Sequence, residues 1–165
     1  MNTKGLVVLA ALALAGCASF DGSGLAPGRS TAKDVEAAMG MPAEQLKVSG
    51  GDSLWFYPKQ PYGRRTYAVR VGSDGVVRSV EQVLTEANFA KIAVGVTTRA
   101  QVRELLGPPY QVVHYERLRR ETWTYAIYSS QRDFFLHVQM SDDGLVREVI
   151  MLEDRYKDQG DGRNL

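Results

Sequence analysis

The chain contains one residue pattern twice, and this duplication constrains its fold more than any other feature. Gly28 and Gly95 lie 95 − 28 = 67 residues apart. The same offset relates four further pairs: Thr31 and Thr98, Val35 and Val102, Gly40 and Gly107, and Pro42 and Pro109. The pairs Trp55/Trp123, Tyr57/Tyr125 and Asp74/Asp143 follow at slightly larger offsets, as loop-length changes would produce. A period of 67 residues is longer than the periods of about 20 to 50 residues found in solenoid repeats. The sequence therefore predicts two copies of a small domain, residues 27–84 and 85–152.

Each copy is predicted to begin with a short helix that ends at a glycine. Thr31 and Thr98 are each followed three residues later by a side chain that can complete a capping box. Gly40 and Gly107 then supply a residue that tolerates positive φ just past the helix end, and a proline follows each of them. A second short helix is predicted over 86–91, and its counterpart near residues 19–25 looks degenerate.

After each helix the pattern of apolar residues changes to period two, which predicts antiparallel strands. Asp74-Gly75 and Asp143-Gly144 predict tight turns, and we favour this role over catalysis because aspartate before glycine suits a turn. Trp55 and Trp123 are expected in the core. The fold class is therefore predicted as α+β: two tandem repeats, each a short helix pair on a three- to four-stranded antiparallel sheet. Units this small are expected to share an interface.

The first 16 residues have the pattern of a secretory signal peptide: one lysine, then an apolar run too short to span a bilayer. Leu14-Ala15-Gly16-Cys17 resembles the bacterial lipobox, which implies lipidation of Cys17. The alternative is an ordinary leader with an incidental cysteine, which the lack of any other cysteine makes less attractive. The sequence thus predicts a signal peptide (1–16), a lipidated tether (17–26) and a disordered tail (153–165).

The motifs together resemble those of the SmpA/OmlA (BamE-like) family of small outer-membrane lipoproteins. The second copy carries them most fully, in Val94-Gly95-Val96-Thr97, Leu106-Gly107-Pro108-Pro109 and Trp123-Thr124-Tyr125. The two tandem copies are similar to the arrangement in β-lactamase inhibitory proteins. The resemblance implies a lipid-anchored protein on the periplasmic face of the outer membrane. It also implies a protein partner, with the β-barrel assembly machinery as the candidate.

Composition and motifs favour a binding protein over an enzyme. The net charge of +1 gives no drive towards nucleic acid. His114 and His137 lack further ligands at metal-binding spacing, and Ser129-Ser130 fits a hairpin loop better than a nucleophile. We therefore expect no catalytic residues, no metal, no cofactor and no small-molecule substrate.

Two groups of residues are candidates for contact with a protein partner or with lipid headgroups. The basic candidates are Arg64, Arg65, Arg117, Arg119 and Arg120. The aromatic candidates are Tyr62, Tyr110, Tyr115 and Phe135, with Phe56 and Tyr128 also at predicted outward positions. Solvated loop charge is the alternative for the arginines. Both sheets are expected to offer an open face to the partner.

Two other functions remain open at this point. A tandem-repeat inhibitor of an envelope or extracellular hydrolase would insert a loop from each copy into one cleft. A small envelope hydrolase would need a pocket with convergent titratable groups.

Overall fold

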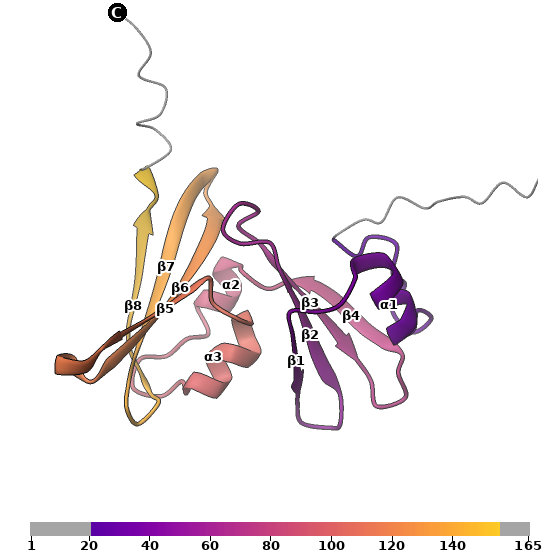
Figure 1. The fold of residues 1–165 in the computed structure, drawn as a ribbon, viewed down its shortest axis with the longest axis horizontal. Helices are drawn as coiled ribbons and strands as arrows, with labels where there is room; N and C mark the ends of the chain where they lie inside the picture. Colours follow the sequence, from indigo (N-terminus) through magenta and orange to yellow (C-terminus); the bar gives the residue numbers. More distant parts are fainter. Residues whose placement is uncertain (1–20, 156–165) are drawn as a thin grey trace, which may run out of the picture.

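The computed structural model describes residues 21–155 (Figure 1). The predicted signal peptide, Cys17 and most of the predicted tail lie outside this range, so those predictions stay untested. The first repeat contains α1 (Ala32–Met39), β1 (Glu44–Lys47), β2 (Ser53–Pro58), β3 (Thr66–Val71) and β4 (Val77–Gln82). The second contains α2 (Glu86–Phe89), α3 (Arg99–Leu106), β5 (Gln111–Tyr115), the 3₁₀ turn η1 (Glu116–Leu118), β6 (Arg120–Ser129), β7 (Arg132–Ser141) and β8 (Val146–Glu153). The predicted α+β class and tandem arrangement are confirmed.

Each repeat contains a four-stranded antiparallel sheet whose strands lie in sequence order. Sheet 1 is β1–β4, and sheet 2 is β5–β8. The second repeat has the predicted helix pair. In the first repeat, the described residues before α1 form turns.

The helix boundaries follow from the predicted capping residues. Thr31 forms a capping box with Asp34, and Thr98 forms one with Gln101. Gly40 and Gly107 end the two helices at φ values of 80° and 74°, in the region that favours glycine.

The Asp-Gly turns hold the helices against the sheets. The Ala32 N–H donates to the Gly75 carbonyl (2.9 Å), and the Arg99 N–H donates to the Gly144 carbonyl (2.7 Å). The turn carbonyls thus satisfy backbone donors that every helix N-terminus leaves free. This explains why the pattern contains both the helix cap and a turn more than 40 residues later.

One face of each sheet packs on the helix of its own repeat and forms a core. In the first repeat the core contains Val35, Met39, Trp55, Tyr57, Val69, Val71 and Val77. In the second it contains Leu84, Ile92, Val102, Leu106, Trp123, Tyr125, Ile127, Leu136, Val138, Met140 and Val146. The predicted core positions of Trp55 and Trp123 are confirmed.

The two repeats stack so that the helices of the second lie between the two sheets (Figure 1). The order of layers is α1, sheet 1, α2 with α3, and sheet 2. Phe56, on the face of sheet 1 turned away from α1, is fully buried and lies against Gly107 at the end of α3. The prediction that Phe56 points outward is therefore wrong, because the second repeat covers it. The expected shared interface exists: the second repeat covers the second face of sheet 1, whereas within residues 21–155 no helix covers the second face of sheet 2.

None of the helices within residues 21–155 is both long and apolar enough to cross a membrane.

Candidate functional site

Arg64 lies in the interface between the repeats. Its Nε is 3.0 Å from Asp133, another of its nitrogens pairs with Asp154, and Nη1 donates to the Phe134 carbonyl (3.1 Å). The guanidinium also lies over the Phe135 ring, 5.3 Å from its centroid. Arg64 reaches these groups from the β2–β3 loop (residues 59–65), which extends to the end of sheet 2.

The burial of Arg64 corrects its predicted role. Its side chain is only 7% exposed and its charge is neutralised by carboxylates of the second repeat, so it is not free to contact a headgroup or partner. Phe135, a second candidate, is half-buried beneath it. The neighbouring Arg65 is exposed and donates to the Tyr67 hydroxyl (3.5 Å), which raises the pKa of Arg65.

Two further contacts join the repeats. Arg103 of α3 forms an ion pair with Glu44 of β1, with Nε and Nη2 at 3.0 and 2.5 Å from the carboxylate oxygens. The same guanidinium lies over the Trp123 ring, at 5.3 Å from the centroid. On the loop side, the Ala126 N–H of β6 donates to Gln60 Oε1 (2.6 Å). These contacts fix the repeats at two separate places.

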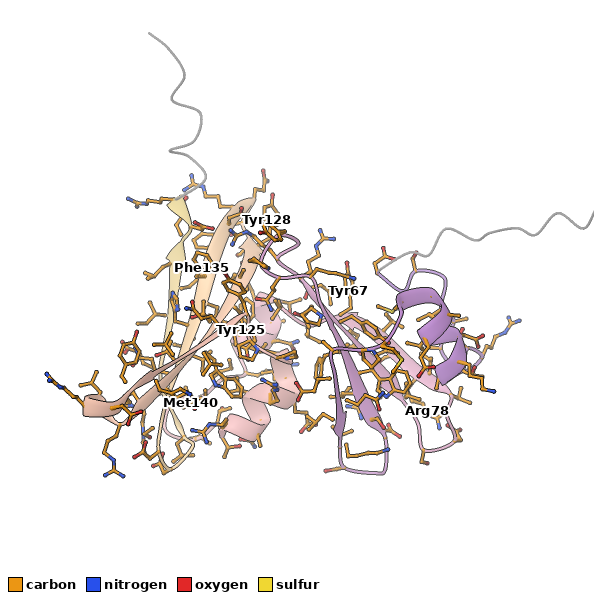
Figure 2. The ribbon with its side chains drawn as sticks, in the orientation of Figure 1. Tyr67, Arg78, Tyr125, Tyr128, Phe135 and Met140 are labelled. Carbon is orange, nitrogen blue, oxygen red and sulfur yellow. The ribbon has the colours of Figure 1, made fainter. Side chains whose placement is uncertain are left out.

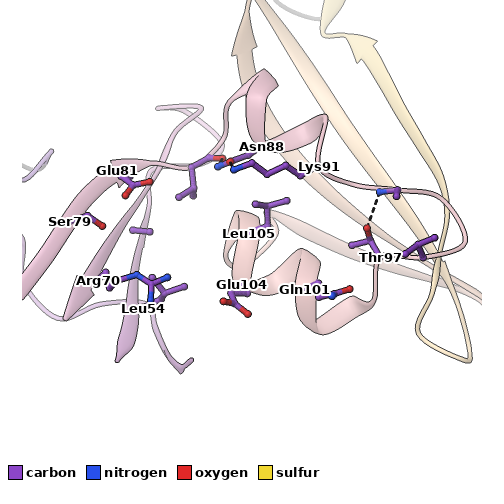
Figure 3. Close-up of a pocket in the computed structure, with 14 residues that line it drawn as sticks. Leu54, Arg70, Ser79, Glu81, Asn88, Lys91, Thr97, Gln101, Glu104 and Leu105 are labelled. Atoms are coloured by element: carbon purple, nitrogen blue, oxygen red, sulfur yellow. Dashed lines mark hydrogen bonds between the residues drawn. The ribbon is translucent and has the colours of Figure 1, made fainter. Parts of the chain in front are cut away.

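To one side of those contacts, towards β3 and β4, the repeats leave a cleft of about 530 Å³ (Figure 3). We call it the inter-repeat cleft. One wall is the covered face of sheet 1, and the other is α2, the following loop and α3. Its lining comprises Leu54, Ala68, Arg70, Ser79, Glu81, Val83, Asn88, Lys91, Ala93, Val96, Thr97, Gln101, Glu104 and Leu105.

The sequence interpretation did not identify the inter-repeat cleft, because the motif residues in its lining, such as Val96, Thr97 and Gln101, were interpreted only as parts of the helix start. A weak signal was present in β3, where Arg70 alternates with the core residues Val69 and Val71. That alternation marks Arg70 as lying on the other face of the sheet. It does not reveal what lies opposite that face.

The second face of sheet 2 is only partly exposed: Thr124 is 5% exposed and His137 is half-buried. The strand register places Thr124 and His137 side by side on it, and the Thr124 hydroxyl lies 2.9 Å from His137 Nδ1. Partial burial lowers the pKa of His137. Phe135 lies 6.2 Å from the His137 ring, and Tyr128 lies on the same face towards the β2–β3 loop (Figure 2).

The other predicted arginines lie at the opposite end of sheet 2, around the turn between β5 and β6. We call residues 115–120 the β5–β6 tip. Arg117 and Leu118 are exposed, and Leu118 is 69% exposed. Arg119 pairs with Asp142 at 2.5 Å, and Arg120 is half-buried. Tyr115 lies beside them, so the structure brings Tyr115 and three of the five predicted arginines together.

The remaining aromatic candidates are apart from the β5–β6 tip. Tyr62 is 93% exposed in the β2–β3 loop of the first repeat. Tyr110 is exposed just before β5, at the far end of that strand from Tyr115. The predicted aromatic set is thus divided among several surfaces and does not form one patch.

The described residues contain no group of three histidine, cysteine or carboxylate side chains able to hold a metal ion. His114 is exposed and lies 3.5 Å from Glu121. Asp74 and Asp143 each accept a backbone N–H two residues ahead, from Val76 (3.1 Å) and Leu145 (3.0 Å). Their predicted turn role is confirmed, and these bonds help to lower the pKa of both carboxyls.

The region that contains α2, α3 and the strands of sheet 2 also has a recognisable sequence profile. Residues 81–149 match the outer membrane protein assembly factor BamE domain. The resemblance predicted from the motifs is confirmed for this part of the chain. Apart from residues 81–84 at its end, the first repeat lies outside the BamE match, although it repeats the order of a helix followed by four strands.

The chain matches none of the curated proteins. Two solved structures are similar to it. One is a DUF4309 family protein (YjgB) from Bacillus subtilis, with 22% identity over 80% of this chain and 84% of that chain, at a TM-score of 0.31. The other is a putative beta-lactamase inhibitor protein from Streptococcus mutans, with 13% identity over 74% of this chain and 82% of that chain, at a TM-score of 0.28.

Proposed function

We propose that this chain is an outer-membrane lipoprotein, lipidated at Cys17, that acts without catalysis as a protein-binding module in outer-membrane protein assembly. The observation that carries the proposal is the match of residues 81–149 to the BamE domain, which links the second repeat to an outer-membrane assembly factor family. We propose the β-barrel assembly machinery as the partner.

The β5–β6 tip is the proposed contact surface. Tyr115 and Leu118 are exposed apolar side chains beside the exposed Arg117. Aromatic side chains, arginine and apolar groups are enriched in the cores of protein interfaces. The tip belongs to the repeat that matches the BamE domain, whereas Tyr62 and Arg65 belong to the other repeat.

The position of the proposed anchor supports this choice. Each residue of an extended chain spans at most about 3.5 Å, so Asp21 lies within about 14 Å of Cys17. Residue 21 enters the fold near Lys59 and Arg65 of the first repeat, and in Figure 1 this part of the chain lies at the opposite end of the molecule from the β5–β6 tip. An anchor at Cys17 would hold the first repeat near the bilayer and leave the second repeat for a partner.

The test is affinity capture of the full chain from native envelopes, comparing wild type with a Tyr115→Ser, Leu118→Ser double variant. We expect β-barrel assembly proteins to be captured by the wild type and to be reduced at least ten-fold with the double variant. Tyr62→Ser is the control, because it removes an even more exposed tyrosine ring from the first repeat. Capture that is unchanged by the double variant would reject the tip as the contact surface.

The anchor is tested separately with Cys17→Ser. We expect this variant to be recovered without lipid and released from the membrane fraction. Retention of a processed, membrane-bound Cys17→Ser chain would overturn the lipoprotein assignment.

A further inference from the structure

The inter-repeat cleft has the features of a preformed binding site. Its volume of about 530 Å³ lies within the 300–1,000 Å³ range of ligand pockets. Leu54 and Ala68 of sheet 1 and Leu105 of α3 provide apolar surface on both walls (Figure 3). The cleft exists only because two repeats are stacked, so a single repeat would not form it.

The walls of the cleft are held apart by contacts outside it. The Arg103–Glu44 ion pair joins α3 to β1, and the contacts of Arg64 join the β2–β3 loop to sheet 2. Phe56 fills the space between these points against Gly107. A ligand would therefore enter an existing space and would not have to separate the repeats, which lowers the cost of binding.

The charged side chains along the cleft differ in whether they already have a partner. Glu81 of β4 and Glu104 of α3 lie on opposite walls, both are exposed, and neither has an ion pair or hydrogen bond among the described residues. Of the two basic side chains of the lining, Arg70 pairs with the Asp52 carboxylate at 3.4 Å. Lys91 donates to the neutral Asn88 Oδ1 at 2.8 Å and keeps its positive charge at the α2 end of the cleft.

We propose that the inter-repeat cleft binds an extended peptide segment of a partner protein, with basic side chains on both sides of a short apolar stretch. The apolar side chains would cover Leu54 and Leu105, and the basic ones would pair with Glu81 and Glu104. Ser79 and Gln101 at the rim offer polar groups to the peptide backbone. An acidic segment would be repelled by the two unpaired carboxylates. The proposal does not depend on the anchor or on the assembly machinery.

The probe is a fluorescent, extended peptide in which two lysines flank a pair of valines, titrated against the purified full chain and followed by anisotropy. A second peptide with glutamates in place of the lysines measures the effect of charge. We expect saturable binding of the lysine peptide only. Exposed ion pairs contribute about 0.2–1 kcal/mol, so Glu81→Gln and Glu104→Gln should each weaken binding by about three-fold.

The site itself is tested with Ser79→Trp, which places a large ring in the cleft from the edge strand β4. We expect this variant to lose binding while its thermal unfolding remains cooperative. The control is Glu148→Gln, which removes an exposed carboxylate on the second face of sheet 2 that has no ion pair or hydrogen bond within residues 21–155. The proposal is overturned if the folded wild type does not bind the lysine peptide, if the glutamate peptide binds equally, or if Glu148→Gln weakens binding as much as Glu81→Gln.

Discussion

The Tyr125 hydroxyl donates a hydrogen bond to the carbonyl oxygen of Gly107, 3.1 Å away. The first repeat contains the same bond, from Tyr57 to Gly40, also at 3.1 Å. In each Trp-x-Tyr pair the tryptophan packs in the core, and the tyrosine satisfies a carbonyl at the helix C-terminus, where acceptors have no partner within the helix. The duplicated motif therefore fixes the end of the helix to the second strand of its sheet.

Replacing either tyrosine by phenylalanine is expected to lower the free energy of unfolding. The change leaves the glycine carbonyl without its donor, and an unsatisfied buried polar group costs about 1–3 kcal/mol. We expect the larger loss for Tyr125→Phe, because Tyr125 is fully buried and Gly107 is also buried. Urea denaturation measures both values. Tyr110→Phe, at an exposed position, is the control and should change stability by less than about 0.5 kcal/mol.

The two tyrosines also predict a loss of stability at alkaline pH. Burial, with a smaller contribution from Glu36, raises the pKa of Tyr57 to about 12, and burial raises the pKa of Tyr125 as well. The unfolded chain ionises its tyrosines near pH 10, so above that pH it binds fewer protons than the folded chain. The contribution of these groups is fully present below pH 10 and is lost as the pH rises towards 12. Denaturation between pH 9 and 12 measures this, and a Tyr57→Phe, Tyr125→Phe variant should show a shallower decline. If the free energy of unfolding declines equally with pH in the wild type and the variant, the two tyrosines are not the cause of the alkaline loss of stability.

The elements within each repeat could be predicted because their boundaries depend on local residue types. Thr31 and Thr98 begin helices, and Gly40 and Gly107 end them through positive φ. Such requirements are satisfied within a few residues or by a motif that recurs in both copies. The duplication made each of these positions visible twice.

The stacking of the repeats could not be predicted, because it depends on residues that the two copies do not share. Phe56 corresponds to Thr124 in the second repeat. The first lies against α3 of the other repeat, whereas the second is buried beside His137 within its own sheet. Strand alternation places both residues on the face away from their own helix, and it cannot distinguish an exposed face from one that another domain covers. The adjacent arginines Arg64 and Arg65 also have different environments, because only the first of them reaches carboxylates of the other repeat among the contacts described above.

Removal of the Arg64 side chain is expected to weaken the interface between the repeats. Arg64→Ala leaves Asp133 and Asp154 without the guanidinium that neutralises them, and breaking a buried pair costs about 3–5 kcal/mol. Arg64→Lys should recover only part of this loss, because an ammonium cannot reproduce the planar geometry that reaches two carboxylates and a carbonyl. Arg65→Ala is the matched control, since this exposed neighbour donates to the Tyr67 hydroxyl of its own repeat. Equal stabilities of Arg64→Ala and Arg65→Ala in urea denaturation would contradict the burial of Arg64.

The equivalent glycines Gly40 and Gly107 separate backbone strain from packing between the repeats. Alanine at either position must adopt a positive φ with ψ near −165°, a region almost restricted to glycine, which costs about 1–3 kcal/mol. A Cβ at Gly40 would meet no atom within 4 Å, whereas a Cβ at Gly107 would lie 2.6 Å from Cδ1 of Phe56. Gly107→Ala should therefore be more destabilising than Gly40→Ala by about 1–3 kcal/mol, the usual cost of overpacking.

A second substitution identifies the source of that difference. Phe56→Leu removes the ring that the new methyl group would meet, so Gly107→Ala should cost less in a Phe56→Leu background than in the wild type. Gly40→Ala should cost the same in both backgrounds, because Gly40 does not contact Phe56. The four free energies of unfolding form a double-mutant cycle whose coupling term measures the contact between the repeats. A coupling term near zero would show that the repeats do not stack through Phe56 and Gly107.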